Sequence, residues 1–284
     1  MKNLDPDGWV RGMQFLDPLA DLGQRLVGAG LRRGGAPAAS AKNLLNGPWL
    51  GHPLHPMLTD IPIGAWTGAA LLDLAGEERA ADLLMAAGCA AGVASAASGI
   101  ADWQDSYGHE RRMGALHGIL NLSALAMLTG ALALRASGRR HAGRPLGRLG
   151  LGLALGAAYF GGELVFRQGT QVNRNAFTEG PSDWTPAVVE SEVQEGRLIS
   201  CRVGDAKVVL TRIGGQVCAA GNVCPHAGGP LSEGRLEGGV VTCPWHGSKF
   251  ELRTGRVLWG PATTPIPTYE ARPGAGGMIE VRAR

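Results

Sequence analysis

The sequence is poor in aromatic residues and in cysteine. Phe, Trp and Tyr together make up 5% of the 284 residues, and there are 5 cysteines. So few cysteines in a chain of this length exclude the disulfide framework of a small secreted domain. The net charge of +3 is too small to indicate a nucleic-acid-binding protein. Residues 1–10 contain Asp5 and Asp7 and no apolar run, which argues against a secretory signal peptide.

The two halves of the chain differ in composition, and 284 residues are enough for two domains. Before about residue 165 the chain is rich in Gly and Ala and contains long apolar runs. Residues 15–31 carry leucines at helical spacing, which predicts an amphipathic helix, and residues 34–40 predict a flexible break. We therefore expect residues 1–50 to form an N-terminal amphipathic or juxtamembrane segment.

Four apolar segments follow, and each approaches the roughly 20 residues that cross a bilayer as a helix. They cover residues 54–74, 80–101, 113–136 and 146–166. The alternative is the buried bundle of a soluble protein, but the segments have too little polar surface for it, since the last one holds a single acid, Glu163. Glycines four residues apart, as at Gly64 and Gly68, let helices approach closely. Residues 51–168 are thus predicted to form an all-α four-helix transmembrane bundle, in which no long internal repeat is evident.

Polar residues near the ends of these segments are of interest because ionisable groups at membrane depth are costly. His52, His55 and Asp60 lie at the start of the first segment, and His117 lies one turn into the third. In one interpretation, His55 and His117 are the axial ligands of a haem b between the first and third helices. In the other, the His-Pro pairs cap the first helix and contact headgroups or a quinone, and His117 is hydrogen-bonded inside the bundle.

The second half of the chain has short β-rich runs. Residues 169–186 are polar and contain Pro, Gly and Asn, which predicts a linker. Gly-containing turns separate the runs that follow, and many short strands predict an all-β antiparallel sandwich or barrel for residues 187–284. The predicted strands are 188–193, 198–203, 208–213, 217–220, 240–243, 250–252, 256–259 and 278–281.

Two boxes in this half carry metal-binding residue types. They read Cys224-Pro225-His226 and, further along, Cys243-Pro244-Trp245-His246. A 2Fe-2S cluster of mixed ligation takes two cysteines on one iron and two histidines on the other. Cys224 and Cys243 would then bind the first iron, and His226 and His246 the second. A structural zinc site is an alternative, although zinc modules usually pair Cys with Cys and His with His. A disulfide between the two cysteines would leave both histidines without a role.

This pattern, C-x-H followed by a spacer and C-x-x-H, resembles the Rieske iron-sulfur family. The resemblance implies a 2Fe-2S cluster surrounded by Trp245, Ser248 and Pro261, with Ser248 as a hydroxyl donor to a cluster sulfur. Gly229 and Trp245 stand where respiratory Rieske proteins have a disulfide, so the chain resembles the ferredoxin-type branch. Phe250 stands where high-potential members have a tyrosine. We therefore expect a potential in the lower half of the Rieske range of roughly −150 to +300 mV.

The His52-Pro53-Leu54-His55-Pro56 element, with Pro62 after it, resembles a family of bacterial four-helix membrane proteins described only as a domain of unknown function, DUF2231-like. The resemblance covers roughly residues 50–168. It departs at Thr59 and Asp60, where a histidine and an aromatic residue are expected. This family supplies no activity.

No histidine follows His246, so the mononuclear iron site of a ring-hydroxylating oxygenase is absent from this sequence. We expect a membrane-anchored one-electron carrier between a redox donor and a partner at the same membrane face. The alternatives are a quinone- or haem-linked oxidoreductase subunit and a membrane-anchored redox or iron sensor. Expected partners are the membrane, a redox protein or quinone and a second copy of the chain, but no nucleic acid.

The expected location is the cell (inner) membrane, with several crossings. Lys and Arg are equally numerous at the two ends of the helices, so the positive-inside rule does not set the orientation. An even number of crossings places the starts of the first and third helices on the same side as the C-terminal domain. We expect that side to be the cytoplasm, because the domain has no disulfide pair and a loaded cluster would require export as a folded protein.

Overall fold

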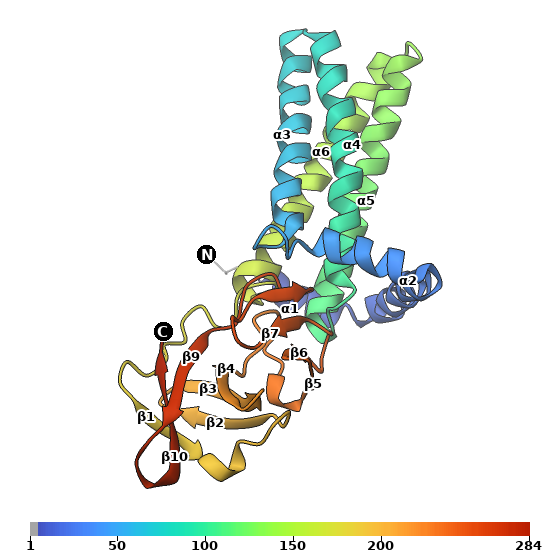
Figure 1. Cartoon of the computed structure of the whole chain (residues 1–284). Coiled ribbons are helices and arrows are strands. Elements are labelled where there is room, and N and C mark those ends of the chain that lie inside the picture. Colours follow the sequence, from blue (N-terminus) through green and yellow to red (C-terminus); the bar gives the residue numbers. More distant parts are fainter. Residues whose placement is uncertain (1–4) are drawn as a thin grey trace. The chain divides into compact units, whose positions relative to one another are not determined.

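The computed structural model describes residues 5–284, so residues 1–4 of the predicted N-terminal segment lie outside the described residues. The chain forms two compact units. One contains the chain up to Leu45 together with Pro53–Thr170, and the other contains Asn46–His52 together with Gln171–Arg284. The first unit is helical and the second is a β-sheet domain (Figure 1). The predicted fold class, an α-helical domain followed by an all-β domain, is therefore confirmed.

The N-terminal region is more helical than its sequence predicts. A short helix α1 (Pro6–Gly12) and a 3-10 turn η1 (Gln14–Leu16) lead into the long helix α2 (Asp17–Asn46). The predicted helix at 15–31 corresponds to the end of η1 and the first part of α2. At Gly35, φ of 57° and ψ of −143° interrupt the helical geometry, and a left-handed φ of this kind favours glycine. The prediction of a flexible break at 34–40 is thus wrong, because the helix continues through these residues with a kink at Gly35.

Four helices follow and pack as a bundle (Figure 1). They are α3 (Leu54–Ala75), α4 (Glu78–Trp103), α5 (Gly108–Ala136) and α6 (Arg140–Gly162), and a π-helical turn η2 (Glu163–Arg167) extends α6. Among the described residues, α4, α5 and α6 with η2 are long and apolar enough to cross a membrane. Helix α3 is not one of these three, and it carries polar residues such as His55 and Asp60.

Close helix contacts in the bundle depend on glycine. The indole of Trp66 on α3 lies against Gly88 and Gly92 of α4, where a Cβ atom would come within 2.6 Å and 3.1 Å of the ring. Any larger residue at these two positions would therefore push α3 and α4 apart. The small residues that the sequence shows at four-residue spacing have this physical role on α4.

The structure contains a repeat that the sequence analysis did not find. The hairpin α3–α4 matches the hairpin α5–α6, because nine buried positions of the first recur in the second at one constant spacing, the 62 residues that separate Asp73 from Arg135. The turn glycines Gly76 and Gly138 match as well, with φ of 84° and 79°. The matching buried pairs are Pro62 and Ala124, Trp66 and Leu128, Ala69 and Ala131, Asp73 and Arg135, Ala81 and Gly143, Met85 and Gly147, Gly88 and Gly150, Gly92 and Ala154, and Ser95 and Ala157.

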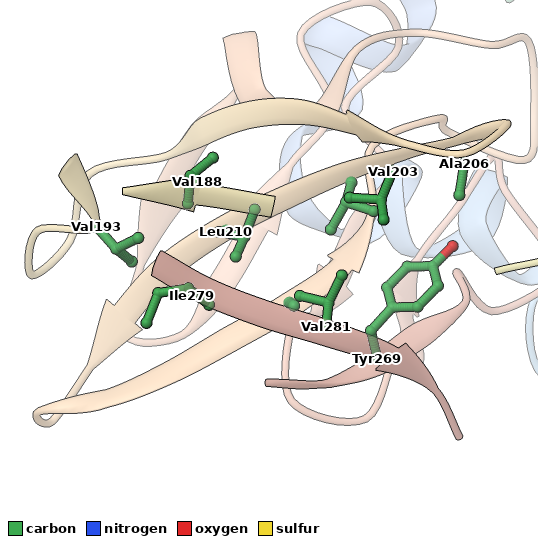
Figure 2. Close-up of a cluster of buried hydrophobic side chains, with 10 residues drawn as sticks. Val188, Val193, Val203, Ala206, Leu210, Tyr269, Ile279 and Val281 are labelled. Atoms are coloured by element: carbon green, nitrogen blue, oxygen red, sulfur yellow. The ribbon is translucent and has the colours of Figure 1, made fainter. Parts of the chain in front are cut away.

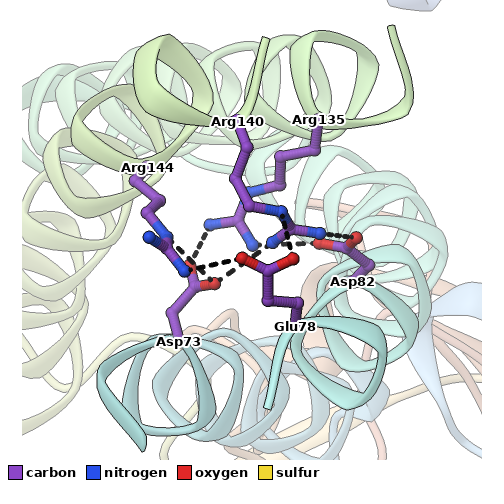
Figure 3. Close-up of polar contacts among 6 residues, drawn as sticks. All are labelled: Asp73, Glu78, Asp82, Arg135, Arg140 and Arg144. Carbon is purple, nitrogen blue, oxygen red and sulfur yellow. Dashed lines mark hydrogen bonds and ion pairs between the residues drawn. The ribbon is translucent and has the colours of Figure 1, made fainter. Parts of the chain in front are cut away.

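At one end of the bundle the matching positions carry opposite charges (Figure 3). Asp73 and Arg135 are bonded to each other, with side chains only 4% and 2% exposed. Arg135 also donates to Asp82 at 3.0 Å. All acids of this group lie on the first hairpin and all bases on the second, so the ion pairs join the two hairpins. We call this group the charge cluster; it consists of Asp73, Glu78, Asp82, Arg135, Arg140 and Arg144.

The β-sheet domain has two antiparallel sheets. The six-stranded sheet has the order β1-β10-β9-β4-β3-β2, and the four-stranded sheet has the order β5-β6-β7-β8. Eight of the strands overlap the predicted runs, whereas β5 and β9 were not predicted. The strands are β1 (Thr185–Val189), β2 (Ile199–Val203), β3 (Ala206–Ile213), β4 (Gln216–Gly221), β5 (Arg235–Glu237), β6 (Val240–Thr242), β7 (Lys249–Glu251), β8 (Val257–Trp259), β9 (Thr268–Pro273) and β10 (Met278–Ala283).

Strand β3 contributes to two hydrophobic cores. Val208 and Leu210 belong to the core of the six-stranded sheet, which Figure 2 shows with residues of β1, β9 and β10. Val209, between them in the sequence, belongs to the second core, which includes Cys224, Cys243 and Phe250. Successive side chains of a strand point to opposite faces, so one strand reaches both cores. The two Cys-containing loops are thereby anchored on the main sheet.

Candidate metal centre

Two loops carry the four candidate ligands, and their backbones close in the same way. In the first loop, the N–H of Cys224 donates to Gly229 O at 2.9 Å, and the N–H of Gly228 donates to Cys224 O at 2.9 Å. In the second, between β6 and β7, the N–H of Cys243 donates to Ser248 O at 2.8 Å, and that of Gly247 donates to Cys243 O at 3.1 Å. Gly228 and Gly247 have φ of 88° and 77°, values that favour glycine. The Gly residues near each box therefore serve to close the loop.

The two thiols are buried side by side. Cys224 and Cys243 are 1% and 3% exposed. The pKa of Cys243 is lowered to about 6, because the Cys224 thiol donates a hydrogen bond to its sulfur and the N–H groups of Trp245 and His246 point at it. The same shared proton raises the pKa of Cys224. A site that stabilises a thiolate in this way is suited to bind a metal, because cysteine binds metals as the thiolate and not as the thiol.

The two imidazoles also form a pair. The ring centroids of His226 and His246 lie 4.9 Å apart, with the ring planes at 88°. A metal–nitrogen bond of about 2.1 Å places a ring centroid roughly 3.2 Å from the metal, so two rings on one metal at about a right angle have centroids about 4.5 Å apart. Both histidines are half-buried. The observed separation therefore fits two histidines on one metal ion.

The four residues form two pairs and do not surround a single point. Within residues 5–284, no three side chains of His, Cys, Asp or Glu gather closely enough to hold one metal ion. A structural zinc ion needs four such ligands around one point. The arrangement of a thiol pair and an imidazole pair fits a two-iron centre better than it fits a single zinc ion.

The residues predicted to surround the centre differ in how far they are buried. Ser248 is fully buried, and its Oγ accepts a hydrogen bond from the N–H of Ala262 at 2.9 Å, which leaves its own O–H free to donate elsewhere. Ala262 follows Pro261, which is buried. Trp245 is 48% exposed, and its ring lies 6.4 Å from that of His246. Ser248 and Pro261 are thus buried, whereas Trp245 is about half exposed beside His246.

Sequence reasoning missed two contributions to this site. A Cβ atom at Gly229 would lie 2.9 Å from Cys243 Sγ, so this position needs glycine for space as well as for the turn. Asn175, assigned to the linker, is buried and donates from Nδ2 to Val223 O at 2.8 Å. Gly229 could be noticed from the sequence because it closely follows the first box. Asn175 lies far from both boxes in the sequence, so its position gave no indication that it contacts the first loop.

The four polar residues proposed for the bundle separate into a pair and two others. The rings of His55 and His117 lie 6.2 Å apart between centroids. His55 Nδ1 lies 2.9 Å from Ser95 O, and His117 Nδ1 lies 2.8 Å from Ala157 O. Asp60 is exposed on α3, and His52 belongs to the other compact unit. The structure therefore brings together His55 and His117 only.

Comparison with known proteins agrees with this geometry. Residues 183–270 match the Rieske [2Fe-2S] domain, and residues 51–174 match the family described as predicted membrane protein (DUF2231). The chain is 34% identical over 89 residues to the ferredoxin component of the naphthalene 1,2-dioxygenase system of Pseudomonas putida, covering 31% of this chain and 86% of that protein. It is 36% identical over 88 residues to ferredoxin CarAc of Metapseudomonas resinovorans, covering 31% and 82%.

A longer relative matches in the same region. Human apoptosis-inducing factor 3 is 39% identical over 94 residues, which cover 32% of this chain and 16% of that protein. Both resemblances predicted from the sequence motifs are confirmed, and a Rieske domain implies a 2Fe-2S cluster. The chain therefore belongs to the Rieske [2Fe-2S] family, with a ferredoxin-like Rieske domain that follows a region matching the family described as predicted membrane protein (DUF2231).

Proposed function

We propose that this protein is a membrane-anchored one-electron carrier, which exchanges electrons with a redox donor and an acceptor at one membrane face. The observation that carries the proposal is the asymmetry of the centre. The thiols of Cys224 and Cys243 are buried, whereas the imidazoles of His226 and His246 are half-buried beside the exposed Trp245. An electron-transfer partner needs a short path to the centre, and the histidine edge provides it.

The chain's own residues have distinct roles in this proposal. Cys224 and Cys243 would hold the buried iron, and His226 and His246 the outer one. The bound cluster supplies reversible one-electron chemistry. The N–H groups that point at the two sulfurs stabilise negative charge there. The O–H of the buried Ser248 would donate to a cluster sulfur and add to this effect. Together these donors set the potential at which the centre works.

The membrane domain limits where the carrier can act. The bacterial relatives are ferredoxin components of dioxygenase systems, and a similar domain here is joined to helices that can cross a membrane. The partner is therefore a redox protein at the membrane surface or a quinone. We propose that the domain lies in the cytoplasm at the cell membrane. The three cysteines outside the centre form no disulfide in the part of the chain that the structure describes, which is in keeping with a reducing compartment.

The test is a redox titration of the purified full-length protein in detergent, followed by EPR. A reversible Rieske signal is expected in the reduced state. Cys224→Ala should abolish this signal, and His246→Cys should lower the midpoint because a charged thiolate replaces a neutral ligand. Cys201→Ala, on β2, is the matched control and should behave as wild type. Survival of the signal in Cys224→Ala would overturn the ligand assignment.

A second candidate function, a haem- or quinone-linked oxidoreductase subunit, is favoured by the His55–His117 pair. Two rings on opposite sides of one metal have centroids roughly 6.4 Å apart, and here the separation is 6.2 Å. Each ring lies close to a carbonyl 40 residues further along the chain, so the two sites are equivalent in the hairpin repeat. A hydrogen bond from Nδ1 to a carbonyl leaves Nε2 as the ring nitrogen that can bind a metal.

The competing role of this pair is structural. The Asn121 amide nitrogen lies 3.2 Å from His117 Nε2. In a purely structural network it would donate a hydrogen bond to that nitrogen, which could then bind no metal. The pyridine haemochrome assay on cluster-loaded protein separates the two roles. Under the haem candidate, wild type contains about one haem per chain and both His55→Ala and His117→Ala lose it. Loaded wild-type protein without haem would leave the quinone form of this candidate, which predicts quinone-dependent oxidation of the reduced protein.

A further inference from the structure

The segment at residues 171–178, which we call the strap, is ordered although its composition predicts a linker. Gln171 has a φ of 60°, a left-handed value that is uncommon for a residue other than glycine, and it turns the chain after η2. The Asn173 side chain then accepts from the N–H of Asn175 at 2.9 Å. The N–H groups of Ala176 and Thr178 donate to carbonyls within the same segment. These local bonds fix the shape of the strap.

The strap is bonded to the loop that carries the first two ligands. The N–H of Arg174 donates to Pro225 O at 3.1 Å, and Asn175 Nδ2 donates to Val223 O at 2.8 Å. Asn175 is only 8% exposed. The carbonyl between these two, that of Cys224, accepts from the N–H of Gly228 inside the loop. Three successive carbonyls around Cys224 are therefore bonded, and the strap supplies two of the donors.

These bonds bear on the sulfur of Cys224. The N–H of His226 belongs to the same peptide unit as Pro225 C=O, and in a planar trans peptide the two groups point in opposite directions. When the strap holds Pro225 O on one side, it directs the His226 N–H to the other side. That N–H donates to the Cys224 sulfur. The orientation of an N–H···S bond at the centre thus depends on the strap.

The strap also joins the two families in one chain. The match to the membrane family ends at Arg174, and the match to the Rieske family begins at residue 183. The donor to Pro225 O is thus the last residue of the membrane-family match, and it follows η2, the extension of the last candidate membrane span. The strap is thus the part of the chain that connects this span covalently to hydrogen bonds with the first ligand loop.

We propose that the strap is a positioning element that raises the reduction potential of the centre, with Asn175 and the Arg174 N–H as its contacts. Hydrogen bonds to the sulfurs are among the factors that set the potential of an iron-sulfur centre. A bond that stabilises negative charge at sulfur favours the reduced state. Loss of the strap contacts lowers the midpoint, and a displacement of the strap would regulate electron transfer. This inference rests on the proposed role of Cys224 as a ligand.

The test uses the full-length protein in detergent. Asn175→Asp keeps the size of the side chain but places an oxygen against Val223 O, and Asn175→Ala removes the donor without introducing a charge. Ser182→Ala is the control, because Ser182 is an exposed polar residue of the same connecting region and its hydroxyl donates to the neighbouring Asp183. Two quantities are measured: the midpoint by EPR redox titration, and the hydrogen–deuterium exchange of the peptides that contain residues 223–227.

Both Asn175 variants should show a lowered midpoint and about tenfold faster exchange of the first loop, since loss of a buried hydrogen bond typically changes such an equilibrium by that order. Ser182→Ala should match wild type in both. Loss of the signal from both Asn175 variants, with native circular dichroism and a loaded Ser182→Ala, would also support the proposal.

Two results would contradict different parts of the argument. A Rieske signal with unchanged midpoint and unchanged exchange in the Asn175 variants would overturn the strap and leave the electron carrier intact. An equal shift in Ser182→Ala would overturn it as well. Wild-type protein that never shows a Rieske signal would instead refute the proposed function.

Discussion

Exchanging the charges of the charge cluster between the two hairpins should leave the bundle folded. The perturbation has two stages. The half exchange replaces the three acids by arginine, and the full exchange also replaces the three bases by acids. In the structure all the ion pairs of the cluster join an acid of the first hairpin to a base of the second. The full exchange consists of Asp73→Arg, Glu78→Arg, Asp82→Arg, Arg135→Asp, Arg140→Glu and Arg144→Asp.

The expected magnitudes follow from burial. The Asp73 and Arg135 side chains are 4% and 2% exposed, so the half exchange leaves two buried charges of the same sign facing each other. Removing one partner of a buried ion pair costs about 3–5 kcal/mol, and like-charge contact adds to this cost. In the full exchange every contact again joins an acid to a base, because the positions match at the constant spacing of the repeat. It should recover more than half of the lost stability.

The assay is unfolding of the full-length protein in detergent, followed by circular dichroism at a fixed detergent concentration. Asp73→Asn provides the reference for losing a single partner. The half exchange should lower the free energy of unfolding by at least as much as Asp73→Asn, and the full exchange should lie between wild type and Asp73→Asn. If the full exchange is as unstable as the half exchange, the two hairpins are not equivalent at these positions and the reasoning from the repeat is wrong.

Three other predictions concern the β-sheet domain. Gly229→Ala should prevent the protein from retaining the cluster, because the new Cβ would clash with Cys243 Sγ. The iron content after gel filtration measures retention, and a wild-type iron content would contradict this prediction. Ser248→Ala should lower the midpoint potential by about 40 mV in a redox titration, since losing a hydrogen bond of about 1 kcal/mol corresponds to this shift for one electron. An unchanged midpoint would mean that the hydroxyl does not reach the centre. The pKa of Glu195 is lowered because the N–H groups of Gly215 and Gly214 donate to its carboxylate, so its contribution to stability is present above the ordinary carboxyl pKa and is lost as the pH falls through the lowered value. Glu195→Gln should therefore flatten the stability–pH curve on the acid side of the ordinary carboxyl pKa, and identical curves would contradict this.

Much of the fold could be predicted from local patterns. Long apolar runs with small residues predicted the bundle helices, and short runs between Gly-containing turns predicted eight of the ten strands. The missed strands lack such a pattern: β5 is the three residues Arg235–Glu237, and β9 carries charged residues among its six. The kink at Gly35 was read as a break, because a glycine signal does not tell whether the helix resumes beyond it.

The hairpin repeat was hidden for a chemical reason. Matching positions often differ in residue type, as Asp73 and Arg135 do, although both are buried and bonded to each other. A comparison of residue types along the sequence therefore finds no similarity between such positions. The strap was missed for a related reason. Its bonds to the first loop connect residues about fifty positions apart, and both end on backbone carbonyls, which carry no sequence signal.

The double role of β3 has a consequence for how the β-sheet domain comes apart. Val209 faces the core that contains both cysteines, and its neighbours Val208 and Leu210 face the core of the six-stranded sheet. A strand cannot leave one core and stay in the other, so neither core can melt alone without breaking the ladder between β3 and its neighbours. The ligand loops and the main sheet therefore form a single cooperative unit, and any ligand that binds the loops protects the sheet from proteases as well.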